Sequence, residues 1–257
     1  MAKFKEFAQS KIGGFILPFA VTVVLFILWE VLVLALGIKP FTLPAPSVIV
    51  TAFLEKSNVL LENAVKTLIN TTLGFAIGVF TGALLGFLIG YSKVAYVVLY
   101  PILVGFNTIP KVALVPLFAL WFGIGTVPAV LTAFLLAFFP IAVNVALGLD
   151  TVEPEMRDVL RSLGASQVEV LHKVGFPHTL PYLFASLKIA ISFAFVGCVI
   201  SETVASNGGI GYLIVTASSN FDVPLVFAGL LSLAVMGIAL YSFFAGMEKV
   251  MIPWARS

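Results

Sequence analysis

Few residues in this chain are of types that do chemistry, and the two histidines come first. His172 and His178 lie six residues apart in the polar segment 160–181, LRSLGASQVEVLHKVGFPHTLP. A metal site needs three or four Cys, His or carboxylate ligands at suitable spacing, and no Cys or carboxylate set is placed to complete this pair. We therefore expect both histidines to face solvent or a partner, and we predict no metal site.

Motifs for nucleotide binding and nucleophilic catalysis are absent from the whole sequence. It has no GxxxxGK[ST] phosphate-binding loop and no Ser, His and Asp arrangement of the hydrolase type. We therefore expect no catalytic residue and no cofactor in this chain.

Glu202 is a different kind of candidate, because it lies near the end of a long apolar run. An ionisable residue inside a membrane is costly, which makes it a functional candidate. It precedes the glycine-rich sequence NGGIG at 207–211. Two interpretations stand. In the first, Glu202, with its neighbour Ser201, belongs to a gate or a re-entrant turn. In the second, Glu202 pairs with Lys111 or caps backbone amides of the turn.

The composition decides what kind of molecule positions these residues. Hydrophobic residues make up 61% of the 257 residues and charged residues 10%, and the mean hydropathy is +1.15. Soluble domains have about 25% charged residues, so this chain lacks the polar surface of a water-soluble globule. The composition predicts an all-α polytopic membrane protein.

Uncharged runs of about 20 residues or more mark the membrane spans. The long run before residue 149 is too long for one crossing, and WFGIGTVP at 121–128 divides it with a turn. Glu30, in the first run, is expected to be paired or to extend to the interface, and Lys188 to anchor a helix end. Six spans are predicted, at about 13–37, 65–91, 94–119, 127–149, 183–205 and 223–247.

Lys and Arg indicate the orientation of the spans. If the N-terminus is cytoplasmic, ten of the 14 Lys and Arg residues fall on the cytoplasmic side and three on the other, with Lys111 unassigned. Cytoplasmic loops carry the excess of positive charge. We therefore expect both termini and residues 150–182 to be cytoplasmic.

The second predicted span carries a glycine at every fourth residue. Small residues at this spacing let helix backbones approach closely in lipid, so we expect a packing role. The stripe drifts by about 40° per step on a helix of 3.6 residues per turn. We therefore expect that one partner helix cannot use the whole stripe, and that this span lies in the interior and touches more than one neighbouring helix. The glycines are Gly74, Gly78, Gly82, Gly86 and Gly90.

Residues 151–181, which include the polar segment, predict two short helices with a rigid joint. Pro154 suits a first helical turn, and Gly164 is a natural left-handed C-terminal cap. Ser166 followed by Glu169 is a capping box that begins a second helix, which we expect to end at Gly175 and Pro177. Each helix has one apolar side. The first consists of Met156, Val159, Leu160 and Leu163, and the second of Val168, Leu171 and Val174.

Such an amphipathic elbow has two interpretations from its spacing alone. It docks into a groove on a soluble partner, or it lies on lipid headgroups as an interfacial helix.

The segment RDVLRSLGASQVEVLHKVGFPHTLP resembles the cytoplasmic EAA loop of permease subunits of bacterial ABC importers, with Asp158-Val159-Leu160 where Glu-Ala-Ala is usual. FTLPAPSVIV (41–50), PKVALVPLFALWFGIG (110–125), FFPIAVNVALGL (138–149) and SETVASNGGIGYLI (201–214) are similar to the branch that serves nitrate, taurine, alkyl sulfonates and vitamin precursors. The resemblance covers nearly the whole chain.

This resemblance implies a type I importer permease of six transmembrane helices in the bacterial inner membrane. Two permease copies would form the pathway, with ATPase subunits that bind ATP and Mg²⁺ below and an extracytoplasmic solute-binding protein outside. The loop 150–182 would insert into a cleft on the ATPase. The coupling residues would be Asp158, Arg161, Gly164, Ala165, Ser166, Glu169, His172, Pro177 and Pro181.

The resemblance also implies a pathway lined by the central spans. Pro110 and Pro140 free backbone carbonyls there, near Asn107, Lys111 and Asn144, which join Ser201 and Glu202 as pathway candidates. The alternative is an ion-gradient-driven secondary transporter or channel, which predicts internal repeats and charged midplane sites. The identity of the substrate stays open between an anion and a vitamin or vitamin precursor.

Overall fold

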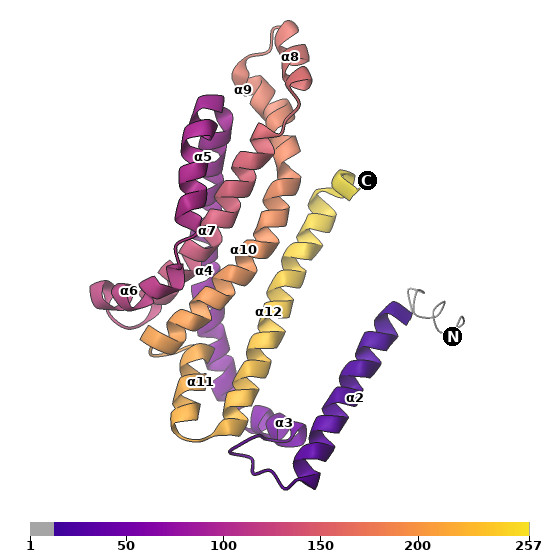
Figure 1. Ribbon diagram of the computed structural model, residues 1–257, viewed down its shortest axis with the longest axis vertical. Coiled ribbons are helices and arrows are strands. Elements are labelled where there is room, and N and C mark those ends of the chain that lie inside the picture. The colour runs from indigo at the N-terminus through magenta and orange to yellow at the C-terminus, as the bar shows by residue number, and fades with distance from the viewer. Residues whose placement is uncertain (1–12, 257) are drawn as a thin grey trace. The chain divides into compact units, whose positions relative to one another are not determined.

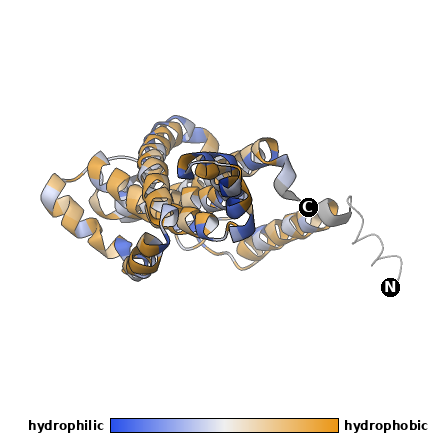
Figure 2. Ribbon diagram, turned by 90° about the horizontal axis from the view of Figure 1, so that it is seen from above, coloured by the Kyte–Doolittle hydropathy of each residue, from blue (hydrophilic) through white to orange (hydrophobic). Residues whose placement is uncertain are grey.

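The computed structural model describes residues 13–256, and every regular element in that range is a helix (Figure 1). Hydrophobic residues dominate the long helices (Figure 2). The α-helices are α2 (Gly13–Ala35), α3 (Pro46–Glu55), α4 (Ser57–Tyr91), α5 (Lys93–Asn107), α6 (Val115–Phe122), α7 (Thr126–Asp150), α8 (Pro154–Ser162), α9 (Gln167–Val170), α10 (Phe176–Ala205), α11 (Ile210–Ser219) and α12 (Val223–Met251). Shorter turns of other helix types are η1 (Lys111–Leu114), η2 (Leu171–Gly175) and η3 (Pro253–Arg256).

The chain divides into two compact units. The first contains Met1–Leu60 and Ile214–Leu231, and the second Leu61–Leu213 and Ser232–Ser257.

In the first unit, Glu30 of α2 binds the start of α3. The Ser47 backbone N–H donates to Oε2 of Glu30 at 2.9 Å, and the Ser47 hydroxyl donates to Oε1 at 2.6 Å. Pro46 begins α3, where its missing N–H costs nothing. The expectation that Glu30 is paired is confirmed, and its partner is a helix N-terminus.

Within residues 13–256, five helical segments are long and apolar enough to cross a bilayer, and a bent pair makes a sixth if it counts as one span. That pair is α5 with η1–α6, which bend by 70°. The span predicted at about 94–119 corresponds to this bent pair, and its bend was not predicted from the sequence. The break follows from Pro110, which has no N–H to donate and disfavours helical backbone at the residue before it.

α4 begins at Ser57, eight residues before the expected span. Glu62 and Lys66 form an ion pair of 2.8 Å one turn apart, with both side chains about half exposed or more. Pairs at this spacing stabilise the solvated end of a helix. Hydropathy alone cannot detect such an extension, because its residues are polar.

The core of the second unit lies along α7. Five alanines have no exposed surface: Ala129, Ala133 and Ala137 of α7, and Ala190 and Ala194 of α10. These small side chains let α7 and α10 pack closely side by side (Figure 1).

The glycine stripe of α4 packs against α7 over its whole length. A Cβ at Gly74 would lie 2.5 Å from the Val130 carbonyl oxygen, and one at Gly90 would lie 2.6 Å from the Leu149 Cβ. The nearest atoms to Gly78, Gly82 and Gly86 also belong to α7. The expectation that one partner helix cannot use the whole stripe is wrong, whereas the expected contact of this span with further helices is present, as between Thr67 of α4 and Glu202 of α10.

The reason lies in the partner helix. The contacted residues of α7 also advance by four, from Val130 and Phe134 through Phe138 and Ala142 to Ala146. The stripe on α4 and the contacted row on α7 therefore wind around their helices in the same sense. Two such rows stay in contact along their length when the helices cross at an angle, as in the packing of i±4 ridges of one helix against those of another. One neighbour can therefore follow the entire stripe.

Candidate functional site

The elbow, residues 154–175, contains two helices joined at Gly164. Gly164 has φ +85. Its N–H donates to Arg161 O at 2.9 Å, and the Ala165 N–H donates to Leu160 O at 3.0 Å. This pair of bonds is a Schellman cap, which needs a left-handed residue at this position. The left-handed cap predicted at Gly164 is confirmed.

The second helix of the elbow begins with the predicted capping box. The Glu169 N–H donates to the Ser166 hydroxyl oxygen at 3.3 Å, and the Ser166 N–H donates to Oε2 of Glu169 at 2.8 Å. Both ends of the four-residue joint, residues 163–166, are thus fixed by hydrogen bonds. Since each cap restrains the backbone, the elbow has one defined angle.

The helix that begins after Ser166 does not end at Gly175 and Pro177, and that prediction is wrong. It passes through the π-turn η2 directly into α10. In this turn the Phe176 N–H reaches back five residues to Leu171 O. A π-turn shifts the hydrogen-bond register, so the chain can accommodate the missing donor of Pro177 and remain helical.

Several contacts fasten the elbow to the helices around it. The Arg157 guanidinium donates to Leu149 O at the end of α7. The Tyr91 hydroxyl at the end of α4 donates to Oε1 of Gln167 at 3.0 Å. Just beyond the elbow, the Phe87 ring of α4 stacks on the Phe176 ring of α10 with centroids 5.8 Å apart. The elbow is therefore held by α4 and α7 and continues directly into α10 (Figure 1).

The remaining elbow candidates lie at its surface or at its base. Asp158 and Arg161 are exposed and 3.9 Å apart, which is a weak pair. His172 is exposed, whereas His178 lies within 3.4 Å of the Thr151 hydroxyl. Pro181 lies inside α10.

The apolar side of the elbow is largely uncovered by this chain. The exposed fractions are 51% for Met156, 60% for Val159, 78% for Leu163 and 67% for Val168. Surface of this kind marks a contact with another molecule.

A second group of polar residues surrounds the glycine turn, residues 206–211. Glu202 is 1% exposed. Its Oε2 accepts from the Thr67 hydroxyl at 2.8 Å and from the Gly211 N–H at 3.1 Å. The Thr67 hydroxyl oxygen in turn accepts from the Ile210 N–H at 2.9 Å. Glu202 and Thr67 therefore satisfy the backbone amides that begin α11.

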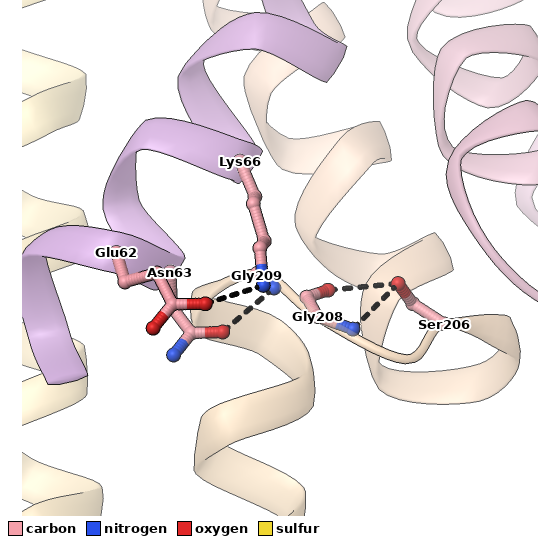
Figure 3. Close-up of polar contacts among 6 residues, drawn as sticks. All are labelled: Glu62, Asn63, Lys66, Ser206, Gly208 and Gly209. Atoms are coloured by element: carbon pink, nitrogen blue, oxygen red, sulfur yellow. Dashed lines mark hydrogen bonds and ion pairs between the residues drawn. The ribbon is translucent and has the colours of Figure 1, made fainter.

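Figure 3 shows how α4 approaches the same turn. The Gly209 N–H donates to Oδ1 of Asn63 at 2.9 Å. Within the turn, the Ser206 hydroxyl donates to Gly208 O and accepts from the Gly208 N–H. Gly209 has φ +98, and a Cβ there would lie 2.2 Å from the Glu202 carboxyl carbon. The turn can thus close over Glu202 only with glycine at this position.

These contacts distinguish the interpretations of Glu202. The carboxylate caps backbone amides, and Lys111 is bonded elsewhere. The Lys111 ammonium donates to the carbonyl and side-chain oxygens of Asn107, at 2.7 and 3.0 Å, and lies 4.5 Å from the centre of the Phe139 ring. The capping arrangement is present, while a gating role stays a prediction.

The other sequence candidates are dispersed. The Asn144 side chain donates to Pro140 O at 2.8 Å, within its own helix. Ser201 is fully buried, and its hydroxyl has no partner among the described residues. Lys188 forms an ion pair of 2.6 Å with Glu248 of α12, and its role as an interfacial anchor stays a prediction.

Residues on α4 that complete the glycine turn were not identified from the sequence. Asn63, Thr67, Asn70 and Thr71 are all buried in the structure. They recur at i, i+4, i+7 and i+8, which is one face of a helix. A polar face in an otherwise apolar helix was the signal that could have found them.

Comparisons with known proteins place this geometry in context. The family model described as binding-protein-dependent transport system inner membrane component matches residues 74–256. The chain is 31% identical to the formylaminopyrimidine transport permease protein ThiX of Halalkalibacterium halodurans, over 90% of this chain and 93% of that protein. It is 32% identical to the riboflavin transport system permease protein RibX of Chloroflexus aurantiacus, over 91% of this chain and 88% of that protein.

A solved structure supports the same fold. The inward-facing MetNI methionine ABC transporter matches with a TM-score of 0.54 and 18% identity, over 76% of this chain and 94% of that chain.

Proposed function

Because this chain belongs to the family of binding-protein-dependent transport system inner membrane components, it is a permease subunit of an ATP-driven ABC importer, and we propose that its elbow is the coupling element. The cytoplasmic loop 150–182 would insert into a cleft on an ATPase subunit, and its movement would be transmitted to the spans. The exposed apolar side of α8 and α9 supplies the surface for that contact.

The continuity of α9, η2 and α10 is the observation that carries this proposal. A loop joined to its span by a flexible linker would lose displacement at the joint. Here the helix that begins at Gln167 continues to Ala205. A rigid helix transmits a movement at one end along its length, so a shift of the elbow would reach the Glu202 end of α10.

The packing of α10 against α7 would spread this movement. A Cβ at Gly148 of α7 would lie 3.0 Å from Tyr182 Cγ, and one at Gly197 of α10 would lie 2.3 Å from Leu136 Cδ1. Helices in such close contact cannot move independently without loss of packing. The stripe of α4 extends the same block, so α4, α7 and α10 would move together.

The remaining assembly follows from the family. We propose two copies of this chain, two cytoplasmic ATPase subunits and an extracytoplasmic solute-binding protein, in the bacterial inner membrane with both termini cytoplasmic. ATP and Mg²⁺ would bind the ATPase subunits, and this chain would have no catalytic site of its own. The relatives named above are transport proteins for formylaminopyrimidine and for riboflavin, which supports a small organic solute as cargo.

Purification and reconstitution test this function. The chain, expressed with its ATPase subunit, should co-elute with it in a fixed ratio and import solute into proteoliposomes only when ATP and the binding protein are supplied. A secondary transporter would instead accumulate solute from an ion gradient without the ATPase. Gradient-driven uptake by the chain alone would contradict the proposal.

A further inference from the structure

Phe221 holds an unusual backbone conformation at the turn between α11 and α12. Its φ is +58, and it is the one residue other than glycine with a positive φ in the range 13–256. The Phe221 N–H donates to Ser218 O at 3.0 Å, and the Asp222 N–H donates to Ala217 O at 2.9 Å. This is again a Schellman cap, with Phe221 at the left-handed position.

The chain itself shows what this position normally takes. The same cap occurs after α2 with Gly37 and after α8 with Gly164, where the left-handed residues have φ +60 and +85. A side chain with a Cβ is crowded in this conformation, and a bulky one is an outlier. The requirements of the cap alone therefore favour glycine at this position. The presence of phenylalanine there must have another explanation.

Packing within the chain does not supply that reason. Phe221 is 78% exposed, so its ring buries little apolar surface against this chain. A strained residue with an exposed ring suggests a contact with another molecule.

A cavity of about 380 Å³ in the same unit lies beside this turn. Its walls include Thr51 and Glu55 of α3, Lys56 just after α3, Asp222 just before α12, and Pro224 of α12. Phe221 directly precedes the wall residue Asp222 in the chain, and an aromatic residue that adjoins a groove with a polar rim matches the composition of protein interfaces.

We propose that Phe221 and this groove form a docking contact for the solute-binding protein. The charged groups of Glu55, Lys56 and Asp222 at the groove suit a soluble protein and are costly to place against acyl chains. The asymmetry of Lys and Arg predicts this turn to be extracytoplasmic, the side on which the binding protein meets the permease. The inference rests on the proposed function, because it needs a transporter stimulated by a binding protein.

The test compares variants that separate the ring from the backbone. Phe221→Asn removes the ring and keeps a residue that tolerates the left-handed conformation. In the reconstituted complex it should raise by about tenfold the concentration of binding protein that half-maximally stimulates ATP hydrolysis. Its Tm should equal or exceed that of the native complex. Phe221→Tyr, which retains the ring, should behave as the native complex does.

The matched control is Phe41→Asn, an exposed phenylalanine of the same unit. In this variant, the concentration of binding protein that half-maximally stimulates ATP hydrolysis should not change. An unchanged value in Phe221→Asn would overturn the docking proposal, while a native complex that no binding protein stimulates would instead overturn the proposed function. A photocrosslinker at position 221 that captures lipid or a second permease copy, and no binding protein, would also overturn the docking proposal.

Discussion

Substitution of one glycine of the α4 stripe tests the packing of the second unit most simply. In Gly86→Ala, the new Cβ would lie 2.7 Å from the Ala142 carbonyl oxygen and 2.7 Å from the Val145 Cβ. Ordinary contacts of this kind begin near 3.4 Å. The two helices must therefore separate by about 0.7 Å, because neither a backbone carbonyl nor a β-branched side chain can move aside.

The cost of this separation can be compared with the gain in helix propensity. Overpacking costs about 1–3 kcal/mol, and replacing glycine by alanine inside a helix contributes about 0.5–1 kcal/mol in the opposite direction. Gly86→Ala should therefore destabilise the complex by about 1–2 kcal/mol. Gly105→Ala in α5 is the control, since a Cβ there meets nothing within 4 Å.

Thermal unfolding of the detergent-purified complexes provides the assay. Gly86→Ala should lower the Tm by a few degrees, and Gly105→Ala should leave it unchanged or raise it slightly. Equal Tm values for the two variants would refute the close contact of α4 with α7.

Three further predictions concern the elbow and the glycine turn. Glu202→Ala leaves the Gly211 N–H and the Thr67 hydroxyl without their acceptor, which should cost about 1–3 kcal/mol and lower the yield of complex; normal yield with lost transport would instead favour a gate. Ser166→Ala removes the N-cap of α9 and should cost about 1 kcal/mol, measured as a lower Tm; an unchanged Tm would show that the cap is dispensable. Gln167→Cys in a Cys198→Ser background should resist a membrane-impermeant thiol reagent in intact cells, and labelling there would contradict the cytoplasmic placement of the elbow.

Much of the fold could be predicted because apolar length and charge-free runs are properties of one helix at a time. The left-handed cap at Gly164 and the capping box at Ser166 were predictable for the same reason, since each depends on residues within three or four positions. The ends of the helices were harder. Gly175 and Pro177 are typical of a helix end, and a single π-turn was enough to carry the chain past them.

Features that depend on a second helix could not be predicted from one. The drift of the glycine stripe indicated several neighbours, and only the matching four-residue advance of α7 shows why one suffices. Likewise, no single helix could show that Thr67, far away in sequence, lies beside the Glu202 carboxylate. The 70° bend after α5 was missed because hydropathy does not change where the backbone turns.

The central claim is that the elbow transmits ATPase movement to the spans, and substitution of its joint tests this most directly. In Gly164→Val a residue with a Cβ must adopt φ +85, which costs about 1 kcal/mol. A Cβ there meets nothing within 4 Å in this chain, as is also true of Gly37 with its φ of +60. Gly37→Val is therefore the matched control for backbone strain.

The decisive measurement is solute imported per ATP hydrolysed in proteoliposomes, together with co-elution of the ATPase. Gly164→Val should reach the membrane in the same amount as Gly37→Val, yet lose ATPase association or hydrolyse ATP without import. Gly37→Val should keep both association and coupled import. Native coupling in Gly164→Val would contradict the account and leave the elbow as a surface helix on the lipid headgroups.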